Sequence, residues 1–175
     1  EDKADLLRTH SVDYVIDFFK KIKKRFHSIK VIDIRDETIT VRKLDWLREF
    51  SEKYKKEIGI RMKCLAEPAT MSFGNVSDEK IRLLVEAGLT DIIIGIQSGS
   101  DRLNREVYNR FITAKHVLDC AKTLNKYKDK LRVMYDVISC NPYETNEDIL
   151  ETIKLLQKIP KPYFLSVNNL IFFAV

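Results

Sequence analysis

The chain has 175 residues, of which 45% are hydrophobic and 33% are charged, a balance that suits one globular domain with a sizeable core. No apolar stretch is long enough to span a bilayer, which argues against a transmembrane helix. The net charge of +5 comes mainly from lysines in predicted helices, so we predict a solvated surface and neither a membrane nor a nucleic-acid partner.

The ends of the chain indicate whether it is part of a longer protein, and its cysteines indicate the redox state of its compartment. The chain begins at Glu1 without a secretory segment and stops inside the apolar run "LIFFAV". We therefore expect residues 1–175 to be a single domain taken from a longer protein. Cys64, Cys120 and Cys140 are far apart and match neither a disulfide nor a zinc spacing, which favours a reduced, cytoplasmic compartment.

Helical and strand patterns alternate along the chain. The segment 12–27 has apolar residues at helical spacing behind a candidate N-cap, Ser11, and the amphipathic segment 43–59 ends at a candidate C-cap, Gly59. A Ser cap, a nearby Glu and a closing Gly predict a helix over 77–88. Further helical segments are predicted at 101–109, 114–127 and 146–159. Strands are predicted at 31–40, 60–68, 91–97, 131–138 and 163–173.

This alternation predicts an α/β fold, in which a parallel sheet of five strands is joined by right-handed crossovers and covered by outer helices. The first predicted helix has no strand before it, so we expect a further strand ahead of residue 1. The edge of the strand 31–40 would then carry unpaired backbone groups. We expect another chain, or the ends of this one, to cover that edge.

Polar residues stand at the carboxyl end of every predicted strand, where parallel sheets place their chemistry. These residues are Asp36 and Glu37, Glu67, the group Gln97, Ser98 and Ser100, the group Cys140, Asn141 and Glu144, and finally Asn168 and Asn169. Loops in general are polar, so the strand interiors carry more information.

Charged residues alternate with apolar residues inside the predicted strands. Asp33 and Arg35 alternate with isoleucines, Lys63 alternates with Met62, and Asp136 precedes Val137. An open sheet with helices on both faces would not place charges within its strands, whereas a barrel with a polar lumen would. We predict that Asp33, Arg35, Lys63 and Asp136 point into the concave face, the position of Asp136 depending on the register of its strand.

Three segments carry recognisable motifs: "IDIRDETIT", "IIIGIQSGSDRLNREVYNRFIT" and "YDVISCNPYETNEDILETIKLLQKIPKP". Together they resemble the radical S-adenosylmethionine (SAM) superfamily, and most of all the group that often carries a cobalamin-binding domain ahead of its barrel. The first resembles the strand-two pattern of that group. The second resembles its strand-four pattern, and the third its strand-five segment. The resemblance covers nearly the whole chain. It implies a partial (β/α)6 barrel, similar to a TIM barrel and truncated here to about five strands.

The superfamily's Cys-x-x-x-Cys-x-x-Cys loop is absent from the sequence. Its three thiolates hold a [4Fe–4S] cluster whose open iron binds SAM. The resemblance places that loop just ahead of Glu1, and the three scattered cysteines cannot replace it. We therefore predict no metal ligand within these residues. The longer protein is predicted to be an enzyme and these residues alone to be inactive.

The chemistry that the resemblance implies is reductive cleavage of SAM to a 5′-deoxyadenosyl radical, which abstracts hydrogen from a small-molecule substrate. If a cobalamin domain lies upstream, methyl transfer is another outcome. The cofactors carry the chemistry, and the protein supplies positioning and a dry barrel.

The same resemblance implies roles for individual residues. Asp36 and Glu37 would accept from the ammonium of SAM, and Arg110 would pair with its carboxylate. Gln97, Ser98 and Ser100 would bond to the ribose and carboxylate, with Gly95 and Gly99 allowing close approach. The backbone over 138–142 would flank the adenine, supported by Asp136.

Each of these residues also has an ordinary reading. Ser100 would cap the following helix, Asp36 and Glu37 would cap the helix that begins near Arg42, and Arg110 would be a surface arginine. Glu144, with Asn146 and Glu147, is read as the start of a helix.

Two other classes of function stay open. The first is an ordinary (β/α)-barrel lyase or isomerase in which Lys63 works with Glu67 or Asp136 as acid and base. The second is a non-enzymatic interaction domain built on a barrel remnant. Iron content and SAM cleavage in the longer protein would separate the first class from a radical SAM enzyme, and the residues ahead of Glu1 would test the second.

Overall fold

The computed structural model describes residues 9–35, 38–71 and 74–171, with the backbone alone at 74–76. Five strands form one sheet in the order β1-β2-β3-β4-β5, and every neighbouring pair is parallel. The strands are β1 (Val31–Ile34), β2 (Arg61–Ala66), β3 (Leu89–Gln97), β4 (Arg132–Ser139) and β5 (Phe164–Asn169). The predicted α/β class and the number of strands are confirmed.

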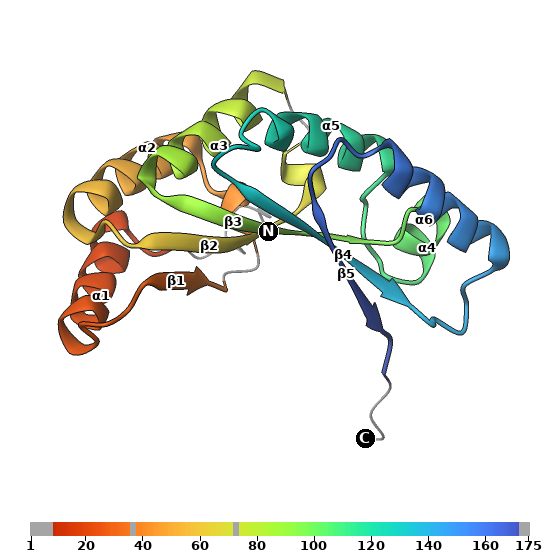
Figure 1. Ribbon diagram of the computed structural model, residues 1–175, viewed down its shortest axis with the longest axis horizontal. Helices are drawn as coiled ribbons and strands as arrows, with labels where there is room; N and C mark the ends of the chain where they lie inside the picture. Colours follow the sequence, from red (N-terminus) through yellow and green to blue (C-terminus); the bar gives the residue numbers. More distant parts are fainter. Residues whose placement is uncertain (1–8, 36–37, 72–73, 172–175) are drawn as a thin grey trace, which may run out of the picture.

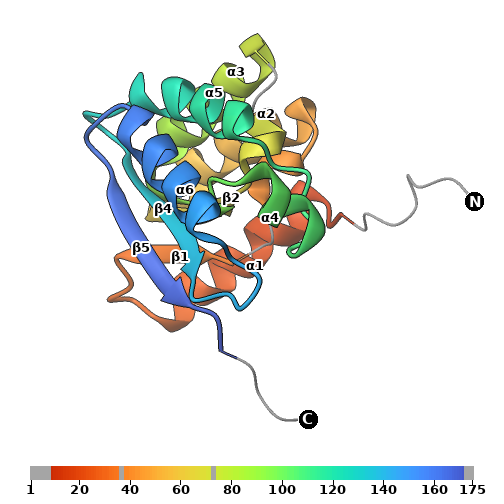
Figure 2. The ribbon, with the colours of Figure 1, turned by 90° about the vertical axis from the view of Figure 1, so that its right-hand side faces the viewer.

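The sheet is curved, and helices cover its convex face while its concave face is left open (Figure 1). The view at right angles shows the same separation of helices from strands (Figure 2). The helices are α1 (Val12–Arg25), α2 (Leu44–Lys53), α3 (Gly74–Ala87), α4 (Asp101–Glu106), α5 (Ala114–Asn125) and α6 (Asn146–Lys158). Short turns of other helix types are η2 (Ile39–Val41), η3 (Tyr54–Ile58) and η4 (Pro68–Met71). In the described part of the chain, no helix is long and apolar enough to cross a membrane.

Local signals account for several helix ends. The Ser11 hydroxyl accepts a hydrogen bond from the backbone N–H of Tyr14, as an N-cap does. Gly59 has φ 63°, and its backbone N–H donates to the Tyr54 carbonyl in η3. This confirms its predicted role as a C-cap. The helix predicted to start at a Ser cap begins earlier, at Gly74, so Ser77 lies inside α3 and is buried there. That prediction of a cap was wrong.

The first strand is shorter than predicted, because threonines redirect the chain after Ile34. The Thr38 hydroxyl accepts from the backbone N–H of Glu67 at 3.2 Å and bonds to the Thr40 hydroxyl at 2.9 Å. Thr40 in turn bonds to Thr70 at 2.5 Å. These side-chain bonds tie the connection after β1 to the end of β2, which competes with extension of the strand.

The core lies between the sheet and the helices. Side chains that alternate along β2, β3 and β4 are turned toward the helices and are buried there: Met62, Cys64, Ala66, Ile92, Ile94, Ile96, Val133, Tyr135 and Val137. The intervening residues face the concave side. A parallel sheet is usually covered on both faces, so this open concave face, which carries charged residues beside apolar ones such as Ile93 and Met134, is the side where a ligand can enter.

A row of alternating charge crosses the concave face in register. Asp33 pairs with Lys63, Lys63 with Asp91, and Asp91 with Arg132. The Lys63 ammonium lies 3.7 Å from the Asp33 carboxylate, and Arg132 lies 2.6 Å from Asp91. Arg35 also contacts Asp33, at 2.9 Å. The predicted polar lumen is confirmed for these residues.

Candidate cofactor-binding site

Strained backbone gathers where the chain leaves the carboxyl ends of β3 and β4. Among the residues that the structure describes, three other than glycine have positive φ: Gln97 at 58°, Asn109 at 51° and Cys140 at 59°. Gln97 ends β3, Asn109 lies in the connection from β3 to β4, and Cys140 follows β4. Such conformations cost about 1 kcal/mol or more each and cluster at functional sites. This edge of the sheet is therefore the candidate site.

Gln97 and Asp136 lie on neighbouring strands at this edge, with both side chains on the concave side. Gly95 is in register with Asp136, and a β-carbon on Gly95 would lie 2.8 Å from the Gln97 amide nitrogen. The Gln97 amide therefore lies over Gly95, beside the Asp136 strand. Within the described part of the chain, neither the Gln97 nor the Asp136 side chain has a hydrogen-bonding or ionic partner. Both are available to a ligand.

Arg110 and Glu67 face each other at the same edge. One guanidinium nitrogen of Arg110 lies 3.6 Å from the Glu67 carboxylate, and the Arg110 side chain is half exposed. They line a cavity of about 430 Å³ together with Ala69, Tyr108, Asn109 and Phe111. An exposed ion pair of this kind is worth at most about 1 kcal/mol. Arg110 can therefore exchange Glu67 for a ligand carboxylate at small cost.

Ser98 and Ser100 point away from the concave face and into α6. Both are buried, and the Ser98 hydroxyl lies 3.2 Å from the Thr152 hydroxyl. The Ser100 hydroxyl donates to the Asp148 carboxylate at 2.6 Å. Ser100 occupies the N-cap position of α4, but its side chain makes no capping bond. In this arrangement the two hydroxyls hold the turn in place, and direct bonding of either to SAM stays a prediction.

The glycine between these serines also serves contact within the protein. A β-carbon on Gly99 would lie 2.4 Å from the Thr152 Cα, far inside van der Waals contact. Its backbone N–H donates to the Thr152 hydroxyl at 2.8 Å. Gly99 was predicted to let a ligand come close, but the backbone of α6 occupies that space.

Asn104 and Asn141 close the two loops of the site. The Asn104 amide donates to the Ser98 carbonyl at 2.9 Å and to the Ile112 carbonyl at 3.4 Å. The Asn141 amide donates to the Tyr108 hydroxyl at 3.0 Å, joining the connection after β4 to the one after β3. These contacts fix the backbone over 138–142, which was predicted to flank an adenine. Asp36 and Glu37 lie outside the described residues.

Glu144 lies beside the same loop. Burial, followed by repulsion from Asp148, raises the pKa of the Glu144 carboxyl, while a hydrogen bond from the Cys140 backbone opposes the shift. The N-cap of α6 is Thr145, which forms a capping box with Asp148. The predicted helix start is thus confirmed, and its cap is the threonine beside Glu144.

A family model described as the radical SAM superfamily matches residues 8–156. The chain belongs to the radical SAM superfamily. This match spans the sheet from β1 to β4 and most of α6. The fold is therefore that of a radical SAM barrel.

Curated relatives of this radical SAM chain match over a shorter stretch. A tRNA-2-methylthio-N(6)-dimethylallyladenosine synthase of Ehrlichia ruminantium (strain Gardel) is 35% identical over 68 residues, covering 39% of this chain and 15% of that protein. The synthase of the same name from Sulfurihydrogenibium sp. (strain YO3AOP1) is 38% identical over 64 residues, covering 37% and 14%. The chain thus matches about one seventh of the length of these relatives.

Solved radical SAM structures share the fold over most of the chain. The methyltransferase TsrM from Kitasatospora setae, with cobalamin and a [4Fe–4S] cluster bound, has a TM-score of 0.67 at 14% identity, covering 91% of this chain and 31% of that one. Coproporphyrinogen III oxidase (HemN) from Escherichia coli has a TM-score of 0.66 at 16% identity, covering 91% and 37%. The cobalamin-dependent enzyme OxsB has a TM-score of 0.67 at 18% identity, covering 85% and 22%. At such identities the likeness shows the fold alone.

The residues present do not fit the superfamily's iron–sulfur cluster. Cys64 and Cys120 are fully buried and Cys140 is exposed, with none of the three near another in the sequence. No group of three His, Cys, Asp or Glu side chains among the described residues is arranged to hold a metal ion. Cluster ligation therefore has no basis in this part of the radical SAM chain.

The residues present do fit SAM in part. SAM carries an adenine amino group, a carboxylate and ribose hydroxyls, which need an acceptor, a cation and neutral polar groups. Asp136, Arg110 and Gln97 supply one of each at the candidate edge, and two of them have no partner within the described residues.

Proposed function

We propose that this chain is the SAM-binding part of the barrel of a radical SAM enzyme. The observation that carries the proposal is the pair of unpartnered side chains, Gln97 and Asp136, on the concave face of a sheet that belongs to this superfamily. Both side chains are only partly buried, so their polar groups are accessible to a ligand from the open concave face. When bound, SAM and a reduced cluster supply a carbon-centred radical, and cobalamin supplies a methyl-transfer route.

The protein's own residues bind and orient SAM in this proposal. Arg110 exchanges Glu67 for the SAM carboxylate, which its planar guanidinium can hold through two hydrogen bonds. Gln97 bonds to the ribose hydroxyls, and the backbone over 138–142 flanks the adenine, which Asp136 supports from the concave face. Asp36 and Glu37 accept from the ammonium. Ser98 and Ser100 contribute through the shape of their turn, since their hydroxyls are bonded to α6.

The cluster comes from residues outside 1–175 in the same proposal, since no cysteine triplet with the superfamily's spacing occurs in the sequence. Residues 1–175 alone are then inactive. The named relatives modify tRNA and two of the structural relatives contain cobalamin. The choice between hydrogen abstraction and methyl transfer rests with the rest of the enzyme and its substrate.

The test is SAM binding by the full-length, cluster-loaded protein, measured by calorimetry. Arg110→Ala should weaken binding by about 1.5–3 kcal/mol, the range for a hydrogen bond to a charged group. Arg105→Ala is the matched control, because Arg105 is an exposed arginine on α4 without a partner among the described residues. Unchanged affinity in Arg110→Ala would show that the pocket has been assigned to the wrong groups. Tight binding of SAM by residues 1–175 alone would show the same.

The acid–base alternative has less support in the geometry. The Lys63 ammonium is paired with Asp33 in the amino half of the sheet, and no described contact joins it to Glu67 or Asp136. Iron analysis and an assay for reductive SAM cleavage separate the two functions. A protein without iron that turns over its substrate would favour the acid–base barrel.

A further inference from the structure

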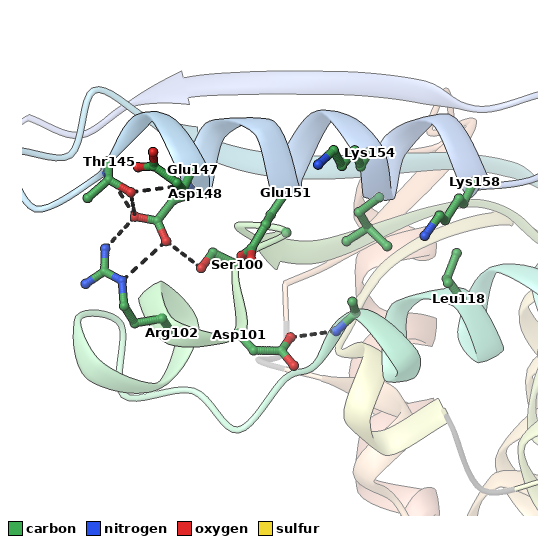
Figure 3. Close-up of a pocket in the computed structure, with 13 residues that line it drawn as sticks. Ser100, Asp101, Arg102, Leu118, Thr145, Glu147, Asp148, Glu151, Lys154 and Lys158 are labelled. Atoms are coloured by element: carbon green, nitrogen blue, oxygen red, sulfur yellow. Dashed lines mark hydrogen bonds and ion pairs between the residues drawn. The ribbon is translucent and has the colours of Figure 1, made fainter.

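The connections that leave β3 and β4 are joined at the first turn of α6, through Asp148. From the β3 side, the Ser100 hydroxyl donates to this carboxylate at 2.6 Å. From the β4 side, Thr145 donates through its backbone N–H at 2.9 Å and its hydroxyl at 2.8 Å. Figure 3 shows the carboxylate between Thr145 and Ser100, with Arg102 on its other side. One carboxylate thus holds both connections.

Arg102 adds a second bond between the same connections. Its guanidinium forms an ion pair with the Asp148 carboxylate and also donates to the Tyr143 carbonyl at 3.0 Å. Arg102 belongs to α4, which follows β3, while Tyr143 lies in the loop after β4. The guanidinium therefore spans the two connections independently of the Ser100 bond.

The environment of Asp148 keeps it ionised. The residue is only 3% exposed, so burial alone would raise its pKa. Hydrogen bonds from Arg102, Ser100 and Thr145 outweigh burial and hold the pKa well below its ordinary value. A carboxylate can accept four such bonds, whereas an amide offers one acceptor oxygen and would turn N–H groups toward these donors.

Both connections lead directly to the candidate SAM contacts. Gln97 stands three residues before Ser100, and the backbone over 138–142 ends one residue before Tyr143. Resting on the proposed function, we propose that Asp148 is a positioning residue for SAM. It touches no ligand, but it fixes the β3 and β4 connections relative to each other so that Gln97 and the loop after β4 meet one SAM molecule together.

The experiment compares SAM affinity with stability in the full-length, cluster-loaded enzyme. Asp148→Asn keeps the shape of the side chain and removes its charge. The matched control is Thr113→Ala, which removes the N-cap hydroxyl of α5, farther along the connection after β3, and leaves every bond between Asp148 and the two connections in place. The melting temperature reports the loss of stability, and calorimetry reports the dissociation constant for SAM.

The dissociation constant should rise about tenfold in Asp148→Asn and stay within twofold in Thr113→Ala, with both melting temperatures lowered. If Asp148 had a purely structural role, Asp148→Asn and Thr113→Ala would bind SAM equally well when their melting temperatures are lowered equally. That result would overturn the inference. Arg102→Ala provides a second variant that leaves the capping box of Thr145 and Asp148 intact. It should also raise the constant, by about threefold or more, and it decides the matter if Asp148→Asn does not fold.

The outcomes separate this inference from the proposed function. Wild-type enzyme that fails to bind SAM would overturn the two together. The positioning role alone would be overturned if the wild-type enzyme binds SAM and Asp148→Asn binds it with the same affinity. If Asp148→Asn does not fold, unchanged affinity in Arg102→Ala would overturn it in the same way.

Discussion

Gly99 and Thr152 are in backbone contact, although 53 positions separate them in the chain. The Gly99 N–H donates to the Thr152 hydroxyl at 2.8 Å, and an added β-carbon would lie 2.4 Å from the Thr152 Cα. Only a residue without a side chain fits there. This contact packs α6 against the turn after β3. That turn lies at the edge of the sheet where SAM is proposed to bind.

Gly99→Ala should therefore destabilise the protein by about 3 kcal/mol, at the upper end of the usual cost of overpacking. Gly95→Ala is its counterpart, because the new methyl group meets the flexible end of Gln97 at 2.8 Å, where the side chain can move aside. Its cost should stay below about 1 kcal/mol. Urea unfolding measures both. Equal midpoints for the two variants would contradict the contact between Gly99 and α6.

The contribution of Asp148 to stability should depend on pH. Its folded-state pKa is lowered below the ordinary value near 4. Its stabilising effect is therefore fully present above about pH 5 and is lost as the pH falls through the folded-state pKa. The difference in unfolding free energy between wild type and Asp148→Asn, about 2 kcal/mol at neutral pH, should shrink below about pH 4. Asp129→Asn, at an exposed aspartate, is the control, and a difference for Asp148→Asn that does not vary with pH would refute the linkage.

The charge row on the concave face predicts a salt-dependent effect at Lys63. Its neighbours in register are Asp33 and Asp91, so Lys63→Met leaves two carboxylates without the cation between them. The loss should be about 0.5–1 kcal/mol and should be smaller at high salt, since the row is partly exposed. Lys30→Met removes an exposed lysine just before β1 and should cost less. Unfolding curves at low and high salt test this, and equal losses for the two variants would speak against the row.

The three thiols should react at very different rates. Burial raises the pKa of the Cys64 thiol to about 12 and raises the pKa of Cys120 as well, whereas Cys140 is exposed. Because the thiolate is the reactive form, a small alkylating reagent should modify Cys140 alone in the native protein and all three after denaturation. Mass spectrometry gives the count. Rapid native labelling of Cys64 would mean that the face of β2 toward the helices is open.

Much of the fold could be read from the sequence, because it depends on neighbours within a few residues. The period of two in "VIDIRDE" places Asp33 on the face opposite Ile32, and the structure agrees. Ser11 caps the start of α1 and Gly59 caps the end of η3, each through a bond to a residue at most five positions away. Polar residues at the carboxyl edge also followed from chain order, since parallel strands end at the same side of a sheet.

The direction of the turn residues needed the tertiary structure. Ser98 and Ser100 stand next to a candidate ligand contact in the sequence, yet their partners on α6 are 54 and 48 positions away. No local period tells whether a side chain after a strand points to the lumen or to a helix. The importance of Asp148 escaped sequence reasoning for the same reason, although Thr145 and Asp148 form the spacing of a capping box ahead of an apolar run.

The sequence by itself determined the order of the elements and the alternation of charge within the strands, because each depends on residue types at short, regular spacings. The family was indicated by motifs that resemble those of the superfamily, and the family model confirms it. Only the tertiary structure decided the register that places Asp136 beside Gly95, and the approach of α6 that takes up Gly99, Ser98 and Ser100. Register and helix docking are set by packing between segments that are distant in the chain, where a shift of one residue turns a side chain from one face to the other.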